Sequence, residues 1–166
     1  IFSSNSTDST NLLARSLIRS GWIQSGDNIV LTDLEHHANL LPRQMLAEQT
    51  GAELRRVHIG MDGALDVEQV KSLIDNNTKI LALSLCSNIT GRVWEQEVKD
   101  LCKYVCPHPN PLPTASLGEG DIPPLVVVDA SQTVVHMSLD VSDLGCDFCF
   151  FTGHKLGALT GTGVLW

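Results

Sequence analysis

Apolar positions along this chain repeat with two periods, one typical of helices and one typical of buried strands. Apolar side chains at helical spacing occur over residues 5–21, 38–51, 66–77 and 95–105. In the first segment, Leu13 with Leu17 and Ala14 with Ile18 recur four residues apart, after a start rich in Ser, Thr and Asp. Asp66 is a cap candidate for the third segment, and Gly21 and Gly51 can end the first two. We therefore expect four helices, the second with Pro42 near its first turn.

Short apolar runs alternate with these helices. Runs at 27–32, 52–59, 79–86, 124–131, 146–152 and 162–166 predict six strands. The runs at 79–86 and 124–131 are continuously apolar, which is typical of strands that are covered on both faces. Strands that alternate with helices favour a three-layer α/β/α domain with a mainly parallel sheet. Ligands of such sheets bind beyond the carboxyl ends of the strands.

The segment at about 106–124 departs from this alternation. It holds six of the seven prolines and shows no apolar period. We interpret residues 1–166 as one domain that carries a proline-rich insertion there, and we expect the insertion to be mobile and dispensable. A polyproline ligand for a partner domain is the alternative.

Composition narrows the possible partners and the compartment. The net charge is −8 and no basic cluster is present, so we expect no nucleic-acid surface. No apolar run reaches the roughly 18 residues that span a bilayer, so we expect no membrane contact. Five cysteines without a regular framework, and no signal peptide, favour a reducing, cytoplasmic setting. The chain opens on IFSSNS without Met and stops inside the last predicted strand, so we expect it to be part of a longer protein.

Polar side chains gather directly after the predicted strands. Taken singly, each is more typical of a cap, a turn or the surface. Together, at the same end of successive strands, they predict a site. They are His36, His37, Asn88, Asp129, Gln132, Thr152, His154 and Lys155.

The chemistry that these groups would share is that of pyridoxal 5'-phosphate. Its aldehyde needs a lysine amine, which Lys155 supplies, and its pyridine nitrogen needs a carboxylate, which Asp129 supplies. Its phosphate needs a helix N-terminus with hydroxyls, and its ring needs a flat partner, for which His36 is the candidate. Thr7, Thr152 and His154 are the candidates for the phosphate.

The order of these segments resembles the class V aminotransferases, in particular cysteine desulfurases of the sulfur-mobilising type and selenocysteine lyases. The motifs that carry the resemblance are EHHAN, DASQ and TGHK, together with STDSTN and TKILALSLCSNITG. The resemblance covers nearly the whole chain apart from the proline-rich segment. It implies the large domain of a fold-type I, pyridoxal-phosphate-dependent transferase, present here as a fragment.

The resemblance also implies roles for single residues. Lys155 would be the Schiff-base lysine and a catalytic residue, Asp129 would pair with the pyridine nitrogen, and His36 would stack on the ring. Gln132 and Asn88 would lie near the ring hydroxyl. Asn-Ser-Thr-Asp stands at the phosphate loop where the family usually has Gly-Thr-Thr-Glu.

For the whole protein, the resemblance implies an enzyme that converts L-cysteine to L-alanine and leaves a persulfide. It implies a cytoplasmic homodimer in sulfur metabolism and iron–sulfur cluster assembly, with a sulfur-acceptor protein as partner. The family's nucleophilic cysteine lies beyond Trp166, so we expect the fragment itself to be inactive. The alternatives are a non-catalytic remnant that self-associates, or another class V chemistry, such as transamination, epimerisation or selenocysteine cleavage.

The cysteines present have a separate interpretation. Cys146 and Cys149 form a C-x-x-C, whose spacing in a strand would direct the two thiols to opposite faces. One interpretation of Cys102 and Cys106 is that they share a helix face and, with His108, offer ligands to a metal ion. We expect no metal site and interpret these cysteines as small buried apolar residues.

Overall fold

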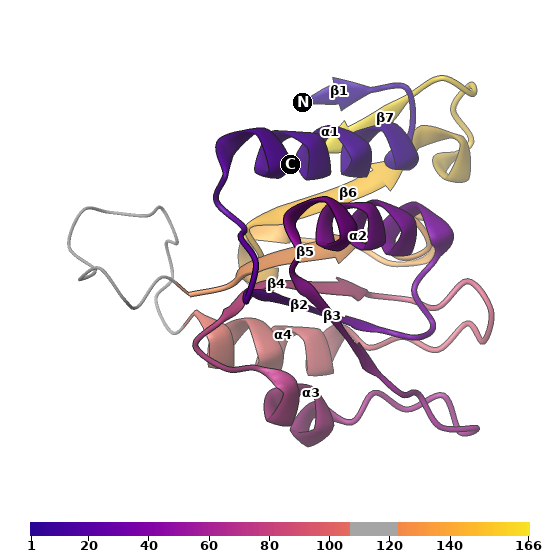
Figure 1. Cartoon of the computed structure of the whole chain (residues 1–166). Coiled ribbons are helices and arrows are strands. Elements are labelled where there is room, and N and C mark those ends of the chain that lie inside the picture. The colour runs from indigo at the N-terminus through magenta and orange to yellow at the C-terminus, as the bar shows by residue number, and fades with distance from the viewer. Residues whose placement is uncertain (107–122) are drawn as a thin grey trace.

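The computed structural model describes residues 1–106 and 123–166, and these form three layers (Figure 1). The predicted insertion at 106–124 lies, apart from its ends, outside the described residues. The elements are β1 (Phe2–Ser3), α1 (Ser6–Ser20), β2 (Asn28–Thr32), α2 (His37–Thr50), β3 (Glu53–Val57), α3 (Val67–Leu73), β4 (Thr78–Ser84), α4 (Glu95–Val105), β5 (Leu125–Asp129), α5 (Thr133–His136), α6 (Val141–Leu144), β6 (Phe148–Thr152), the 3₁₀ helix η1 (Gly153–Leu156) and β7 (Gly163–Leu165).

The middle layer of the described residues is a seven-stranded sheet in the order β1-β7-β6-β5-β4-β2-β3. The pairs from β3 through β2, β4 and β5 to β6 are parallel. Strand β7 runs antiparallel to both β6 and β1. The prediction of a mainly parallel sheet between helices is therefore confirmed.

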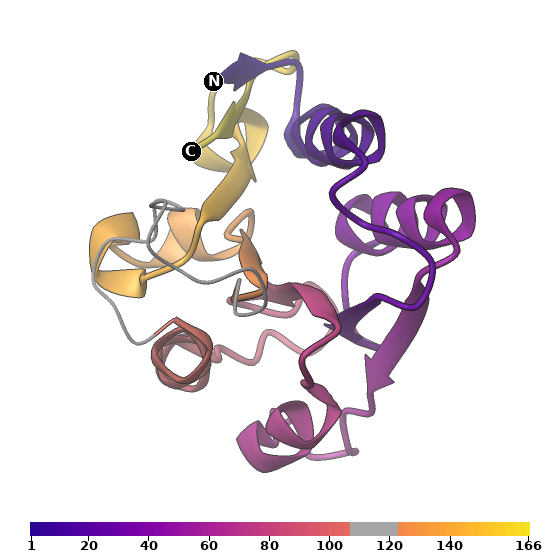
Figure 2. The ribbon, with the colours of Figure 1, turned by 60° about the vertical axis from the view of Figure 1, so that its left-hand side comes forward.

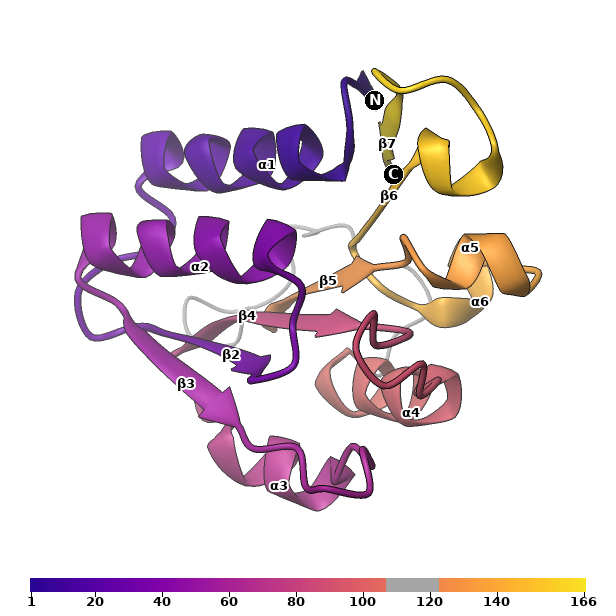
Figure 3. The ribbon, with the colours of Figure 1, turned by 90° about the vertical axis from the view of Figure 1, so that its right-hand side faces the viewer.

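Helices cover both faces of the sheet, as Figure 3 shows, with α1 and α2 on one face and α3 and α4 on the other. The side chains of β4 alternate between the two cores. Leu81 and Leu83 belong to the core on the α3 and α4 face, and Ile80 and Ala82 to the core under α1 and α2. Each face of this strand is buried, which explains why its sequence is continuously apolar.

Strand β1 was not predicted, because two residues cannot display a period. It is fixed by contacts with the other end of the chain. Phe2 pairs with Val164, and the Ile1 amine donates to the Leu165 carbonyl oxygen at 2.7 Å. The two termini of the chain consequently lie side by side (Figure 2).

The ends of the long helices follow the predicted capping residues. Gly21 ends α1 with a φ of 67° and donates its amide to Ile18, and Gly51 ends α2 with a φ of 76°. Asp66 caps α3 by accepting the amides of Glu68 and Gln69. Helix α3 is shorter than predicted and ends at Leu73.

Pro42 lies in the second turn of α2 rather than in its first, which corrects the prediction. A proline has no amide hydrogen, so the carbonyl four residues earlier, that of Ala38, loses its helical donor. The Thr10 hydroxyl on α1 donates to this carbonyl at 2.6 Å. The contact satisfies a buried acceptor and fastens α1 to α2.

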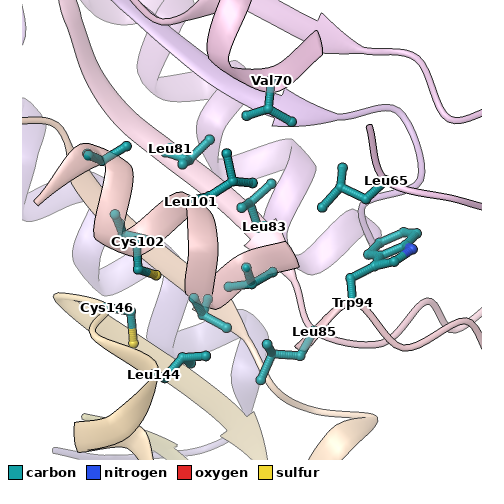
Figure 4. Packing of buried hydrophobic residues seen from close by; sticks show 14 of the residues in the cluster. Leu65, Val70, Leu81, Leu83, Leu85, Trp94, Leu101, Cys102, Leu144 and Cys146 are labelled. Atoms are coloured by element: carbon teal, nitrogen blue, oxygen red, sulfur yellow. The ribbon is translucent and has the colours of Figure 1, made fainter. Parts of the chain in front are cut away.

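The prediction that Cys146 and Cys149 face opposite sides of a strand was wrong. Cys146 lies before β6, in the turn that follows Gly145, so strand alternation does not apply to it. Both side chains belong to the same core cluster, together with Cys102 of α4. Figure 4 shows Cys102 and Cys146 among the leucines of this cluster.

Two further properties of the described residues concern membranes and metal ions. Among residues 1–106 and 123–166, no helix is both long and apolar enough to cross a membrane. The same described residues hold no group of three or more His, Cys, Asp or Glu side chains arranged to bind a metal ion.

Candidate active site

A cavity of about 590 Å³ opens where β4, β5 and β6 end, beside the first turn of α1. The last residue of each of these strands lines it: Ser84, Asp129 and Thr152. The structure brings eight predicted residues to this cavity, although their roles stay predictions, whereas His37, the first residue of α2, does not line it. The eight are Thr7, His36, Asn88, Asp129, Gln132, Thr152, His154 and Lys155.

The first turn of α1 lines one part of the cavity. Asn5 caps the helix, because its Oδ1 accepts a hydrogen bond from the Asp8 amide at 2.8 Å. Asp8 Oδ2 in turn accepts one from the Ser4 amide at 3.0 Å. Amides in the first turn of a helix have no acceptor within the helix. Those of Ser6 and Thr7 therefore remain available to an anion in the cavity.

Glycine allows β7 to lie against this turn. A Cβ atom on Gly163 would stand 2.5 Å from the carbonyl carbon of Asn5, which no side chain tolerates. Gly163 also pairs with Thr152 at the end of β6. Thr152 is buried, and its Oγ1 lies 2.9 Å from Nδ1 of His154. Because β7 approaches α1 so closely, the first turn of α1 and the side chains of Thr152 and His154 line the same cavity.

Lys155 lies in η1, directly after β6, and its side chain is exposed. Gly157 ends this turn with a φ of 80°, in the left-handed region. Within the part of the chain that the structure describes, Lys155 forms no ion pair. Lys71 and Lys99 do so at 2.8 and 2.7 Å, and hydrogen bonds to the carboxylates raise the pKa of both. Lys155 therefore keeps an amine that no described carboxylate holds.

Asp129 presents a buried carboxylate to the cavity. Its Oδ1 accepts a hydrogen bond from the Ser131 amide at 2.8 Å. Burial raises the pKa of the Asp129 carboxyl, whereas hydrogen bonding from Ser131 and the charge of His36 lower it. A buried carboxylate of this kind gains from a cationic partner such as a protonated ring nitrogen.

His36 stands at the N-cap of α2, which begins at His37, one residue before its predicted start at residue 38. Its Nδ1 accepts a hydrogen bond from the Ala38 amide at 3.0 Å, which fixes the ring relative to the helix. In the neutral form the proton is then on Nε2. Asn88 follows β4, and Gln132 immediately precedes α5, so both amides lie beyond strand ends.

Residues that were not predicted also line the cavity, Ser84 and Ser131 among them. Ser84 ends β4, and its register partner on β5 is Asp129. Cys86 is half-buried, forms an isolated antiparallel β-bridge with Val93 and lines the cavity. A smaller hollow of about 310 Å³ adjoins the cavity and shares Cys86, Asn88 and Gln132 with it. Ser84, Cys86 and Ser131 lie within the predicted runs 79–86 and 124–131, so the sequence pattern did not show that these strands end at Ser84 and Asp129.

The described residues fit the demands of pyridoxal phosphate. Free helix amides with a nearby hydroxyl suit a phosphate, a buried carboxylate suits a pyridinium nitrogen, and an unpaired lysine suits an aldehyde. Gly163 lets β7 pack against the start of α1, since any side chain there would overlap Asn5.

A family model described as "Aminotransferase class-V" matches residues 1–166. The chain belongs to the class V aminotransferase family. This is a family of pyridoxal-phosphate-dependent enzymes, and the chain is a cysteine desulfurase-like member of it. It is 38% identical over its whole length to a cysteine desulfurase of Pectobacterium carotovorum subsp. carotovorum strain PC1, and 38% identical to one of Salmonella newport strain SL254. The chain spans 37% of the length of each of these curated relatives.

Solved structures of the family superpose on the whole chain. The cysteine desulfurase CsdA of Escherichia coli is 34% identical with a TM-score of 0.83, and a cysteine desulfurase of Thermococcus onnurineus NA1 is 32% identical with a TM-score of 0.81. The chain covers 37% of each of those chains. A NifS-like protein at 22% identity and a TM-score of 0.81 shares the fold. The prediction of a class V enzyme of fold-type I, present as a fragment, is confirmed.

Proposed function

We propose that residues 1–166 are the pyridoxal-phosphate-binding large domain of an enzyme that takes sulfur from L-cysteine. The observation that carries this proposal is the shared cavity. It joins the free amides of α1, the carboxylate of Asp129 and the amine of Lys155, all with the required chemistry. The cysteine desulfurase relatives support the choice of L-cysteine over other amino acids.

Each of these residues has a physical task in the proposal. When bound, pyridoxal phosphate supplies an aldehyde for covalent attachment and a ring that withdraws electrons from the substrate. Lys155 would hold the aldehyde and then move the α-proton of the amino acid, acting as general base. Asp129 would keep the ring nitrogen protonated, and His36 would cover one face of the ring. The amides of Ser6 and Thr7, with Thr152 and His154, would bind the phosphate.

Asn88 and Gln132 would contact the ring hydroxyl in this proposal. Sulfur would then pass from L-cysteine to a cysteine thiol of the whole protein, and L-alanine would leave. For the whole protein we also propose a cytoplasmic homodimer that hands sulfur to an acceptor protein during iron–sulfur cluster assembly. Exposed apolar side chains support a covered surface, since Phe2 is 92% and Leu159 is 87% exposed.

The proposal is tested by incubating the chain with pyridoxal phosphate, reducing it with borohydride and mapping the labelled peptides by mass. We expect a visible absorbance band on binding and a label on Lys155. Lys155→Ala should lose the label, and Lys103→Ala, which removes an exposed lysine of α4, should keep it. A label spread over several lysines, or absent despite cofactor binding, would reject the role of Lys155.

A further inference from the structure

Glu35 is a buried carboxylate beside the cavity that none of the roles above includes. It follows β2 and immediately precedes His36, and it is 5% exposed. Four hydrogen bonds converge on it. Oε1 accepts from the Thr32 hydroxyl at 2.8 Å and from the Ser84 amide at 3.0 Å. Oε2 accepts from the Ser84 hydroxyl at 2.7 Å and from Asn39 Nδ2 at 2.8 Å.

These four contacts suit an ionised carboxylate, which offers acceptors only. Burial raises the pKa of Glu35, and the hydrogen bonds from Ser84, Asn39 and Thr32 lower it. A positive charge is buried nearby as well. Arg43 of α2 is fully buried, and none of its side-chain nitrogens has a hydrogen-bond partner among the described residues. Burial lowers the pKa of Arg43 to about 10, and the charge of Glu35 opposes that change.

Stability does not account for this arrangement. Two buried charges that do not form a direct ion pair keep much of their desolvation cost. Apolar residues of similar volume are often at least as stabilising at such positions. The reason for Glu35 is therefore to be sought in the groups that its hydrogen bonds connect.

Glu35 connects three elements, of which β4 ends at the cavity. Thr32 ends β2, Asn39 lies in the first turn of α2, and Ser84 ends β4. Ser84 pairs in register with Asp129, and both line the cavity. On the other side, Glu35 is covalently joined to His36. One carboxylate thus ties the turn that carries His36 to the strand end beside Asp129.

We propose that Glu35 is a positioning residue, which fixes His36 relative to Asp129 across the strand ends of the cavity. The consequence for cofactor binding rests on the proposed function, because His36 is there the group that covers the ring. The geometric part concerns the chain alone and is measurable without any cofactor.

Three substitutions separate the hydrogen bonds of Glu35 from its charge. Glu35→Ala removes all four acceptors. Glu35→Gln removes the charge yet can keep four hydrogen bonds, because Asn39 can turn its amide and present Oδ1, which has no partner now. Glu35→Asp keeps the charge but is one methylene too short to reach the same donors. Glu48→Gln, an exposed position on α2, is the matched control.

The first readout is the ¹⁵N NMR spectrum of the His36 ring in the cofactor-free chain. We expect a single tautomer with Nδ1 as acceptor in the unsubstituted chain, in Glu35→Gln and in the control. In Glu35→Ala and Glu35→Asp the ring should sample both tautomers, because the turn no longer holds Nδ1 against the Ala38 amide. If Glu35 only filled space, its substitution would change the free energy of unfolding without changing the tautomer of His36.

The second readout is the affinity for pyridoxal phosphate, followed by the absorbance of the bound cofactor. We expect about a tenfold loss for Glu35→Ala and less than about threefold for Glu35→Gln. If the unsubstituted chain binds no cofactor, the proposed function fails, and the His36 spectra still decide the role of Glu35. If Glu35→Ala does not fold, Glu35→Asp decides it. A folded variant of either kind with unchanged His36 signals would overturn the proposal.

Discussion

Two opposing electrostatic effects act on Asp129. Burial at the end of β5 favours the protonated acid, whereas the Ser131 amide and His36 favour the carboxylate. A protonated ring nitrogen would supply the missing positive charge, so the residue is costly in the empty chain and useful in the loaded one. The same tension is typical of residues that serve a site rather than the fold.

We expect Asp129→Asn to stabilise the cofactor-free chain near neutral pH. The folded-state pKa of Asp129 lies above its unfolded value, so its favourable contribution is complete below about pH 4 and is lost as pH rises through the folded pKa. Asparagine keeps the acceptor for Ser131 without the charge. Urea unfolding should therefore show a gain at about pH 7 and none at about pH 4.

The same variant should bind pyridoxal phosphate with an altered absorbance spectrum, because ring-nitrogen protonation falls when the carboxylate is removed. A chain with Asp129→Asn that is no more stable at neutral pH would contradict the electrostatic account of burial. An unchanged cofactor spectrum would contradict the pairing of Asp129 with the ring nitrogen. The two measurements are independent, so either part can fail alone.

At the scale of elements, the site depends on how α1 begins. The Asn5 side chain accepts the Asp8 amide and the Asp8 side chain accepts the Ser4 amide. The amides of Ser6 and Thr7, which line the cavity, have no acceptor within the helix. The 3₁₀ helix η1 follows β6 directly and places Lys155 at the cavity. Both are short local structures that connect a regular element to the cavity.

We expect Asn5→Ala to lower the free energy of unfolding by about 1 kcal/mol, because the capping acceptor of α1 is lost. The affinity for pyridoxal phosphate should fall as well, since the first-turn amides lose their fixed direction. Asn76→Ala, an exposed asparagine in the turn before β4, is the control and should change neither quantity. Equal effects of the two substitutions in urea unfolding and cofactor titration would remove the special role of Asn5.

At the scale of the whole molecule, the described strands assemble into one seven-stranded sheet. All seven strands of the described residues find partners, and the two termini meet at β1 and β7. The chain nevertheless spans 37% of the cysteine desulfurases that it resembles. The cavity proposed for the cofactor is lined by residues of this chain, and the proposed sulfur chemistry needs a thiol in addition.

None of the five cysteines places a reactive thiolate in the cavity. Cys102, Cys146 and Cys149 are buried, and burial raises the pKa of Cys102 to about 12. Cys86 lines the cavity, but burial raises the pKa of its thiol too, so little thiolate forms at neutral pH. Cys106 ends α4, on an element that does not line the cavity.

We therefore expect residues 1–166 to release alanine and sulfide from L-cysteine far more slowly than a full-length relative, even with pyridoxal phosphate bound. The loss of a positioned nucleophile alone is worth about 7–11 kcal/mol of barrier. Cys86→Ala should leave the residual rate unchanged. Turnover at the rate of a full-length relative, abolished by Cys86→Ala, would overturn this expectation. Alanine and sulfide assays with added reductant measure it.

The sequence by itself determined α1 to α4, β2 to β7 and their order, whereas β1, α5, α6 and η1 are too short to display a period. Continuous apolar runs such as that of β4 are typical of a strand buried on both faces, and Gly21, Gly51 and Asp66 mark helix ends through local backbone chemistry. Because parallel strands end at one edge of a sheet, the same patterns also placed Asp129 and Lys155 near each other.

Only the tertiary structure decided what depends on partners remote in the chain. The pairing of Phe2 with Val164 needs the far terminus, and the Ala38 carbonyl left free by Pro42 needs Thr10 of another helix. Glu35 shows the same limit most clearly, because its partner Ser84 stands 49 residues away. Local patterns record the preferences of the backbone and of burial, whereas the partners of a buried polar group are fixed only when the sheet brings distant segments together.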